Sequence, residues 1–331
     1  MWTWLARLIG IAEQAGGVSS RVALTLDPTA GDRRLKTLRG ELRTGQWLEA
    51  KRHLDSLSDP DERTRLIEVL AEGPGELPLA GWVAAEPESS LPLLLRARNR
   101  IYWAWEARGS GTADTVSASG ANAFLDRLEL AEDDLEAAAA LDPKDPTPHA
   151  FGLITARGLG IPLAEARARF ARAQGARPDH LLAHQALLVR LCEKWGGSHE
   201  AMFAHAREAT AQAGPGSRLH ALIPMAHAER WLFGYAFDED ESFARYFERP
   251  EVIEEIEAAH EACFARGRKQ ARLVDLELRN HFAFALWLGK RGGKARRELQ
   301  EIGTHFTQLP WGFLDAPDRA FARARGELGL G

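Results

Sequence analysis

The chain has 331 residues, of which 45% are hydrophobic and 27% are charged, and its formal net charge is −5. An apolar share of this size is typical of a folded protein and argues against wholesale disorder. The slightly acidic balance supplies no overall basic face for displacing counterions from phosphates, so no nucleic-acid partner is expected. Ala, Leu, Arg and Glu dominate, and because these side chains lose little rotamer freedom in a helix, the composition favours an all-α fold.

The chain has two cysteines, Cys192 and Cys263, and neither belongs to a CxxC or Cys/His pattern. Disulfide frameworks and structural zinc sites use more closely spaced ligands. We therefore expect a cytoplasmic protein with no metal or other cofactor.

Residues 1–30 begin with MWTWLARLIGIAEQAGG, an apolar stretch that carries Arg7. The stretch is too short to span a bilayer, and it lacks a small-residue cleavage site. We interpret it as an amphipathic helix that caps the first repeat and leads into a linker. A membrane-surface anchor is the alternative, and no membrane span is expected.

Residues 31–216 contain a repeated pattern of small and large apolar residues that ends in proline. Two copies lie about 35 residues apart, with Ala131, Leu135, Ala138 and Pro143 recurring as Ala166, Phe170, Ala173 and Pro178. The small alanines would let a paired helix approach closely, and Phe170 would fill the groove between helices. A third copy occurs at 38–57, a fourth lies near the C-terminus at 282–302, and a looser fifth runs over 181–201. The pattern predicts antiparallel helix pairs stacked into a right-handed solenoid.

Capping signals and breaks divide this array. Asp59–Pro60, Thr147–Pro148 and Ser198 each place a capping side chain at the start of a helix. Residues 108–120 are rich in Gly, Ser and Thr and predict a mobile surface loop between two helices. Residues 217–331 are less regular and are expected to continue the array as divergent repeats. Pro224 should kink a helix there.

These motifs resemble those of tetratricopeptide-repeat proteins, whose units have a period of about 34 residues and an A-x3-F…P pattern. The chain also looks like an uncharacterised bacterial, largely actinobacterial, family of helical proteins. The segments behind that second resemblance are WAWEARG (103–109), KWGGSHE (194–200), AHAER (226–230) and NHFAFALW (280–287) with Pro310–Trp311. The resemblance implies stacked helix pairs and carries no reaction, ligand or catalytic residue.

Two histidines, His180 and His184, lie four residues apart and would share one face of a helix. That spacing suits two metal ligands, and His149 stands at nearly the equivalent place one repeat earlier. No Glu follows His180, so the metalloprotease pattern is absent. A surface or capping role is the interpretation we favour for this pair.

The segment 194–230 holds the polar residues with the strongest claim to a ligand site. Ser198 next to His199 suggests a nucleophile, but no GxSxG pattern is present, and no strand precedes the serine. We favour a role for Ser198 as a helix cap after the Gly196–Gly197 turn, because it explains every residue of the segment. The other residues either join neighbouring helices or line a pocket for a small molecule or metal, in a regulator or an enzyme. The candidates are Trp195, His199, Glu200, His220, His227, Glu229 and Arg230.

A solenoid of helix pairs exposes a concave groove lined by the first helix of each pair. By repeat position, the groove candidates are Phe151, Thr155, Gln185, Val189 and Cys192. Their mixed apolar and amide character suits an extended peptide or a partner helix. We therefore expect a non-enzymatic protein-interaction scaffold with a protein or peptide partner, and homo-oligomerisation is also possible.

Overall fold

The computed structural model describes residues 24–109, 117–265, 272–314 and 316–331. Throughout these residues the regular structure is helical, and no strand occurs among them, which confirms the all-α prediction. Within the same ranges no helix is both long and apolar enough to cross a membrane. The predicted N-terminal helix and most of the 108–120 loop lie outside the described residues.

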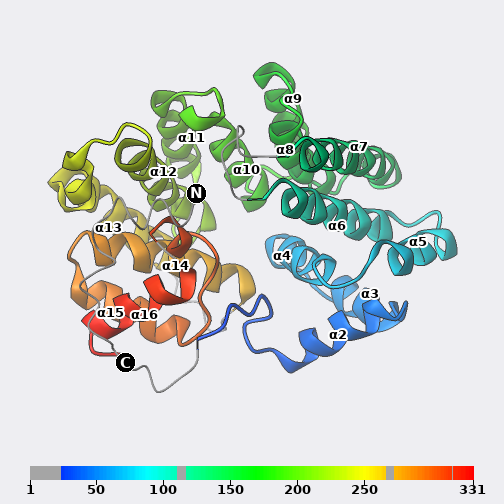
Figure 1. Cartoon of the computed structure of the whole chain (residues 1–331), viewed down its shortest axis with the longest axis horizontal. Coiled ribbons are helices and arrows are strands. Elements are labelled where there is room, and N and C mark those ends of the chain that lie inside the picture. The colour runs from blue at the N-terminus through cyan, green and yellow to red at the C-terminus, as the bar shows by residue number, and fades with distance from the viewer. Residues whose placement is uncertain (1–23, 110–116, 266–271, 315) are drawn as a thin grey trace. The chain divides into compact units, whose positions relative to one another are not determined.

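The chain forms two compact units, Gly31–Arg190 and a second that contains Leu191–Gly331. The sequence-based division at 216/217 concerned the regularity of the repeats and stays a prediction. In the first unit the helices follow one another with short connections (Figure 1). They are α2 (Arg33–Arg43), α3 (Leu48–Asp55), α4 (Pro60–Ala71), α5 (Glu76–Ala85), α6 (Ser90–Arg108), α7 (Ala118–Leu141), α8 (Thr147–Gly158), α9 (Leu163–Ala176) and α10 (Leu181–Leu191).

Helices adjacent in sequence pack against each other in this unit, as α6 does with α7 and α8 with α9. Some helices also contact the next but one along the chain, since α2 touches α4, α4 touches α6 and α6 touches α8. Arg96 of α6 pairs with Asp134 of α7, and Arg127 of α7 donates to the carbonyl of Trp103 of α6. Later residues of α6 thus lie beside earlier residues of α7. The pair is therefore antiparallel. Sequential packing of neighbours is established, and the solenoid remains a prediction.

The predicted register holds at its small residues. Ala131, Ala138, Ala166 and Ala173 are all fully buried. Phe170 is only half-buried, and its ring meets the His184 ring edge-on at a centroid distance of 4.9 Å. Phe170 therefore does not fill the core as Leu135 does, which is 4% exposed.

Capping signals confirm two of the three helix starts. The Asp59 side chain accepts hydrogen bonds from the backbone at the start of α4, and Ser198 does the same at the start of α11. Thr147 is itself the first residue of α8, and its N–H donates to Asp145 Oδ1 at 2.8 Å. Asp59 and Ser198 thus act as the predicted caps, because their side-chain oxygens accept hydrogen bonds from N–H groups that have no partner within the first turn of the helix.

The second unit is built around α14, which contacts α12, α13 and α15. Phe282, Phe284 and Leu286 of α14 are fully buried. Its α-helices are α11 (His199–Gln212), α12 (Leu222–Ala236), α13 (Pro250–Phe264), α14 (Leu273–Leu288), α15 (Gly292–Ile302) and α16 (Pro317–Glu327), with 3-10 turns η2 (Glu193–Trp195), η3 (Arg218–Ala221), η4 (Glu241–Glu248) and η5 (Trp311–Phe313).

The kink predicted at Pro224 is wrong. α12 begins at Leu222 after the separate turn η3, so Pro224 lies in the first turn of the helix. Backbone N–H groups in the first turn have no acceptor within the helix. Proline lacks this N–H, so its presence in the first turn costs no helical hydrogen bond.

The NHFAFALW and Pro310–Trp311 segments meet in this unit. Asn280 donates to the carbonyl oxygens of Leu276 and His305, and it accepts a hydrogen bond of 2.7 Å from Trp311 Nε1. The fully buried amide and indole thus satisfy each other and fix the chain after α15 onto α14.

Candidate functional site

The side chains predicted to line the groove are mostly buried. Phe151 and Thr155 are fully buried, and Gln185 and Cys192 are 8% and 3% exposed, while Val189 is half-buried. These four buried side chains offer little surface to a partner. The groove assignment stays a prediction.

The N-terminal ends of α4, α8 and α10 converge in a polar cluster. Thr64 Oγ1 lies 3.2 Å from Thr147 Oγ1 and 3.0 Å from His180 Nε2. Asp61 of α4 accepts a hydrogen bond of 2.9 Å from the backbone N–H of Leu181. Thr64, Thr147 and His180 are at most 2% exposed, so these helix starts are packed against one another.

The histidine pair does not occupy a surface position. His180 is fully buried, which lowers its pKa, and His184 Nε2 donates to the carbonyl of Pro178 at 2.9 Å. The predicted surface role is therefore wrong. The predicted capping role is closer to what is found, because His184 bonds to Pro178, which lies just before the start of α10. Among the described residues no group of three or more His, Cys, Asp or Glu could hold a metal ion.

KWGGSHE forms the tight turn between α10 and α11. Gly196 has φ +77, and a Cβ on Gly197 would lie 2.0 Å from the carbonyl oxygen of Leu191. Ser198 Oγ accepts a hydrogen bond of 3.1 Å from Ala201 N, and His199 Nε2 pairs with Glu193 at 3.0 Å. The turn therefore depends on its glycines, and the Ser198 hydroxyl is used as the helix cap.

AHAER places His227 in a buried hydrogen-bonded cluster. Nδ1 of His227 lies 2.7 Å from the Tyr246 hydroxyl, and Nε2 lies 3.0 Å from Glu255 Oε2. Arg207 donates two hydrogen bonds to the same carboxylate, at 2.7 and 2.9 Å. Burial raises the pKa of the Tyr246 hydroxyl. The imidazole thus joins α12 to η4 and α13, and both of its nitrogens are engaged.

The remaining candidates of 194–230 have separate contacts. Glu229 forms an ion pair of 2.5 Å with Lys194, His220 Nε2 donates to the carbonyl of Gly214, and Arg230 stacks over Phe243 at 4.3 Å. Glu200 is exposed and Trp195 half-buried. Burial lowers the pKa of His199, and the nearby Arg230 charge lowers it further. His199 and Arg230 are thus neighbours, but the set as a whole serves contacts within the unit.

The Glu255 carboxylate gives the His227 cluster a testable pH dependence. Hydrogen bonds from Arg207 and then from His227 lower the pKa of Glu255 from 4.5 to about 2. Between pH 4.5 and about 2 the folded state therefore binds fewer protons at Glu255 than the unfolded state does. The contribution of Glu255 to the free energy of unfolding is complete above about pH 4.5, and it is lost as the pH falls towards 2. Glu255→Gln should therefore lower the free energy of unfolding at neutral pH by about 1–3 kcal/mol.

The measurement is urea unfolding of wild type and variant across that pH interval. The difference between them should shrink as the solution becomes more acidic. Glu254→Gln, at an exposed neighbouring position with no ion pair among the described residues, is the control and should follow wild type. A difference that stays constant with pH would contradict the assignment.

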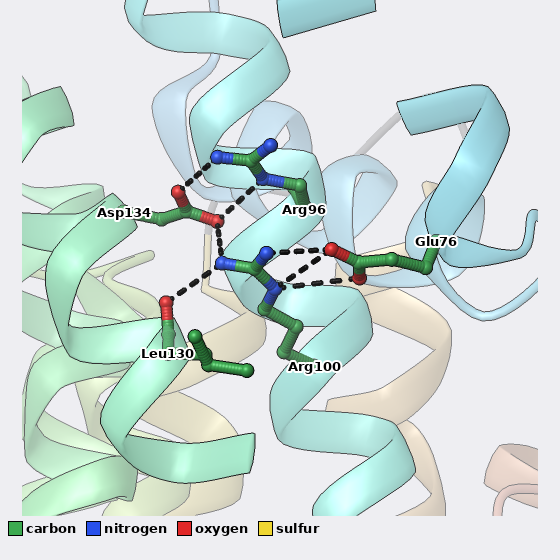
Figure 2. A network of polar contacts seen from close by, with 5 residues as sticks. All are labelled: Glu76, Arg96, Arg100, Leu130 and Asp134. Atoms are coloured by element: carbon green, nitrogen blue, oxygen red, sulfur yellow. Dashed lines mark hydrogen bonds and ion pairs between the residues drawn. The ribbon is translucent and has the colours of Figure 1, made fainter. Parts of the chain in front are cut away.

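An ion-pair network across α5, α6 and α7 involves residues that the sequence reasoning did not single out (Figure 2). Asp134 of α7 accepts from Arg96 Nη2 at 2.6 Å and Nε at 2.9 Å, and from Arg100 Nη1 at 2.8 Å. Arg100 also donates to Glu76 of α5 at 2.5 Å and to the carbonyl of Leu130 at 2.8 Å. Asp134 is 3% exposed. Two guanidinium groups and two carboxylates thus balance in charge and join three helices.

Beside this network, apolar side chains remain exposed on the same three helices. Leu77 follows Glu76 on α5 and is 84% exposed, and Leu130 of α7 is 47% exposed. Trp103 of α6 is 45% exposed, with the Arg127 guanidinium 3.5 Å from its ring centroid. Trp105 is half-buried and packs on Phe124 at a centroid distance of 4.9 Å.

Comparison with known proteins adds no family to this description. No protein-family model matches the chain, and no curated protein or solved structure matches it either. What is established is an all-helical protein in which neighbouring helices pack in sequence.

Proposed function

We propose that this chain is a helical scaffold that binds a protein partner through exposed side chains of α5, α6 and α7. The observation that carries the proposal is the exposure of five large apolar side chains there: Leu77, Trp103, Leu125, Leu130 and Leu141 are each between 39% and 84% exposed. Large apolar side chains that gather on a surface are typical of interaction sites.

Trp103 is the natural anchor of such a contact. Arg127 stacks on its ring and donates a hydrogen bond of 2.7 Å to its backbone carbonyl. A tryptophan that is already held in place loses little side-chain entropy on binding, and tryptophans often dominate the affinity of interfaces. The adjacent network of Arg96, Arg100 and Asp134 holds α6 and α7 together beneath it.

The polar residues of 194–230 support a scaffold more than a ligand site. His227 has both ring nitrogens engaged, and Glu229 is paired with Lys194. Side chains committed to joining helices are not arranged around a common substrate position. The resemblance to tetratricopeptide-repeat proteins points to the same class of function.

The test is site-specific photocrosslinking in the organism that makes the protein. A benzophenone amino acid replaces Trp103 or Leu130, and in control variants it replaces the exposed Glu208 of α11 or Gln300 of α15. We expect one partner protein to be crosslinked from the first two positions and not from the controls. Crosslinks to a second copy of this chain would indicate a homo-oligomer, and an absence of position-dependent crosslinks would overturn the proposal.

A further inference from the structure

The outward face of α7 carries acidic side chains without partners. Asp126, Glu129, Asp133 and Glu136 are spaced three or four residues apart, which places them on one face of the helix. All four are exposed, and none forms an ion pair with another described residue. The other carboxylates of this helix behave differently, because Glu132 is paired with Arg169 and Asp134 with two arginines.

Exposed helix faces in soluble proteins usually mix charges of both signs. From Asn122 to Ala140 the only basic residue is Arg127, and its guanidinium is stacked on Trp103. No positive charge from α7 itself therefore balances its outward carboxylates. From Asp126 to Glu136 the face therefore carries charge of a single sign along roughly three turns of helix.

Two leucines border this acidic face. Leu125 is 41% exposed at one edge, and Leu130 is 47% exposed at the edge nearest α6, where Arg100 reaches its carbonyl. The helix thus offers a central row of carboxylates with apolar side chains on both sides. A complementary ligand needs cationic groups in the middle and apolar groups that reach outward.

We infer that α7 docks a basic amphipathic helix of a partner protein, whose Lys or Arg side chains pair with these carboxylates and whose apolar side chains cover Leu125 and Leu130. Opposite charges steer such a helix onto the surface and fix its orientation, and the leucines are removed from water when it arrives. The inference rests on the proposed function and names the chemistry of the partner.

The test is fluorescence anisotropy of a labelled synthetic helix of about 18 residues, in which a central row of lysines is flanked on both sides by leucines. We expect it to bind the full-length chain, with an affinity that falls as added salt shortens the Debye length. Glu129→Lys/Asp133→Lys should weaken binding by about tenfold or more, because two attractions become repulsions. Leu125→Ala/Leu130→Ala should also weaken it.

The matched control is Glu208→Lys/Glu254→Lys, which makes the same change in net charge at exposed positions on α11 and α13. Equal weakening by both double variants would mean non-specific attraction, and it would overturn the inference. So would preferred binding of a peptide with glutamates in place of the lysines, absence of binding, or a wild-type dimer that buries α7.

A failure of this kind is distinguishable from failure of the proposed function. Crosslinks from Trp103 or Leu130 to a partner protein would still stand if the basic peptide did not bind. That combination would retain the scaffold and replace the chemistry of its partner. Circular dichroism spectra and melting curves of both double variants establish that they are folded.

Discussion

Asp134→Ala is expected to lower the free energy of unfolding by about 3–5 kcal/mol, because it leaves two arginines without their shared partner. Asp134 is 3% exposed, and the side chains of Arg96 and Arg100 are 18% and 11% exposed. A guanidinium in such surroundings has little water to replace the lost carboxylate. Removing one member of a buried charge network therefore costs far more than breaking a surface pair.

The experiment is equilibrium unfolding in urea, and the control is the preceding residue. Asp133 has almost the same local sequence, but it is exposed and has no ion pair with any described residue. Asp133→Ala should change stability by less than about 0.5 kcal/mol. If the two alanine variants unfolded at the same urea concentration, the network would contribute nothing to stability.

The contrast between Asp133 and Asp134 shows what periodicity can reveal. Ala131, Leu135 and Ala138 mark the buried face of α7, and Asp134 falls within that stripe, whereas Asp133 does not. The sequence could therefore have singled out Asp134 as a buried carboxylate. It could not have identified Arg96 and Arg100 as its partners, because that contact depends on how α6 is placed against α7.

Signals that act over a few residues were predictable. Asp59 and Ser198 cap the helices that they precede, and the alanines of the repeat are buried. A capping side chain and the backbone N–H that donates to it lie within one turn, so tertiary packing has little influence on them. The all-α class followed from the same kind of local preference.

The groove prediction depended on packing between helices that are far apart in the sequence. Repeat position indicates which helix of a pair faces inward, but it does not give the separation of successive inward helices. In this chain Thr64 reaches both Thr147 and His180, so the starts of α4, α8 and α10 touch. Contacts between residues so far apart in sequence depend on how several helices are placed against one another, which no local pattern specifies.

Gly197→Ala is the second substitution for which we expect a large effect, a loss of about 3 kcal/mol in the free energy of unfolding. A Cβ at this position would lie 2.0 Å from the carbonyl oxygen of Leu191 and 2.4 Å from its carbonyl carbon, so the backbone must move. That movement would disturb the bonds that Gly197 N and Ser198 N donate to the carbonyls of Cys192 and Leu191. It would also displace Ser198 from its cap on α11.

Gly214→Ala separates this steric effect from the general cost of replacing a glycine. Nothing lies within 4 Å of a Cβ at Gly214, and this residue also lies outside the helices. We expect its urea unfolding curve to match wild type or shift slightly to higher urea, because alanine restricts the unfolded chain. Equal stability of the two variants would mean that the turn after α10 accommodates a side chain, and the requirement for Gly197 in KWGGSHE would then need a different explanation.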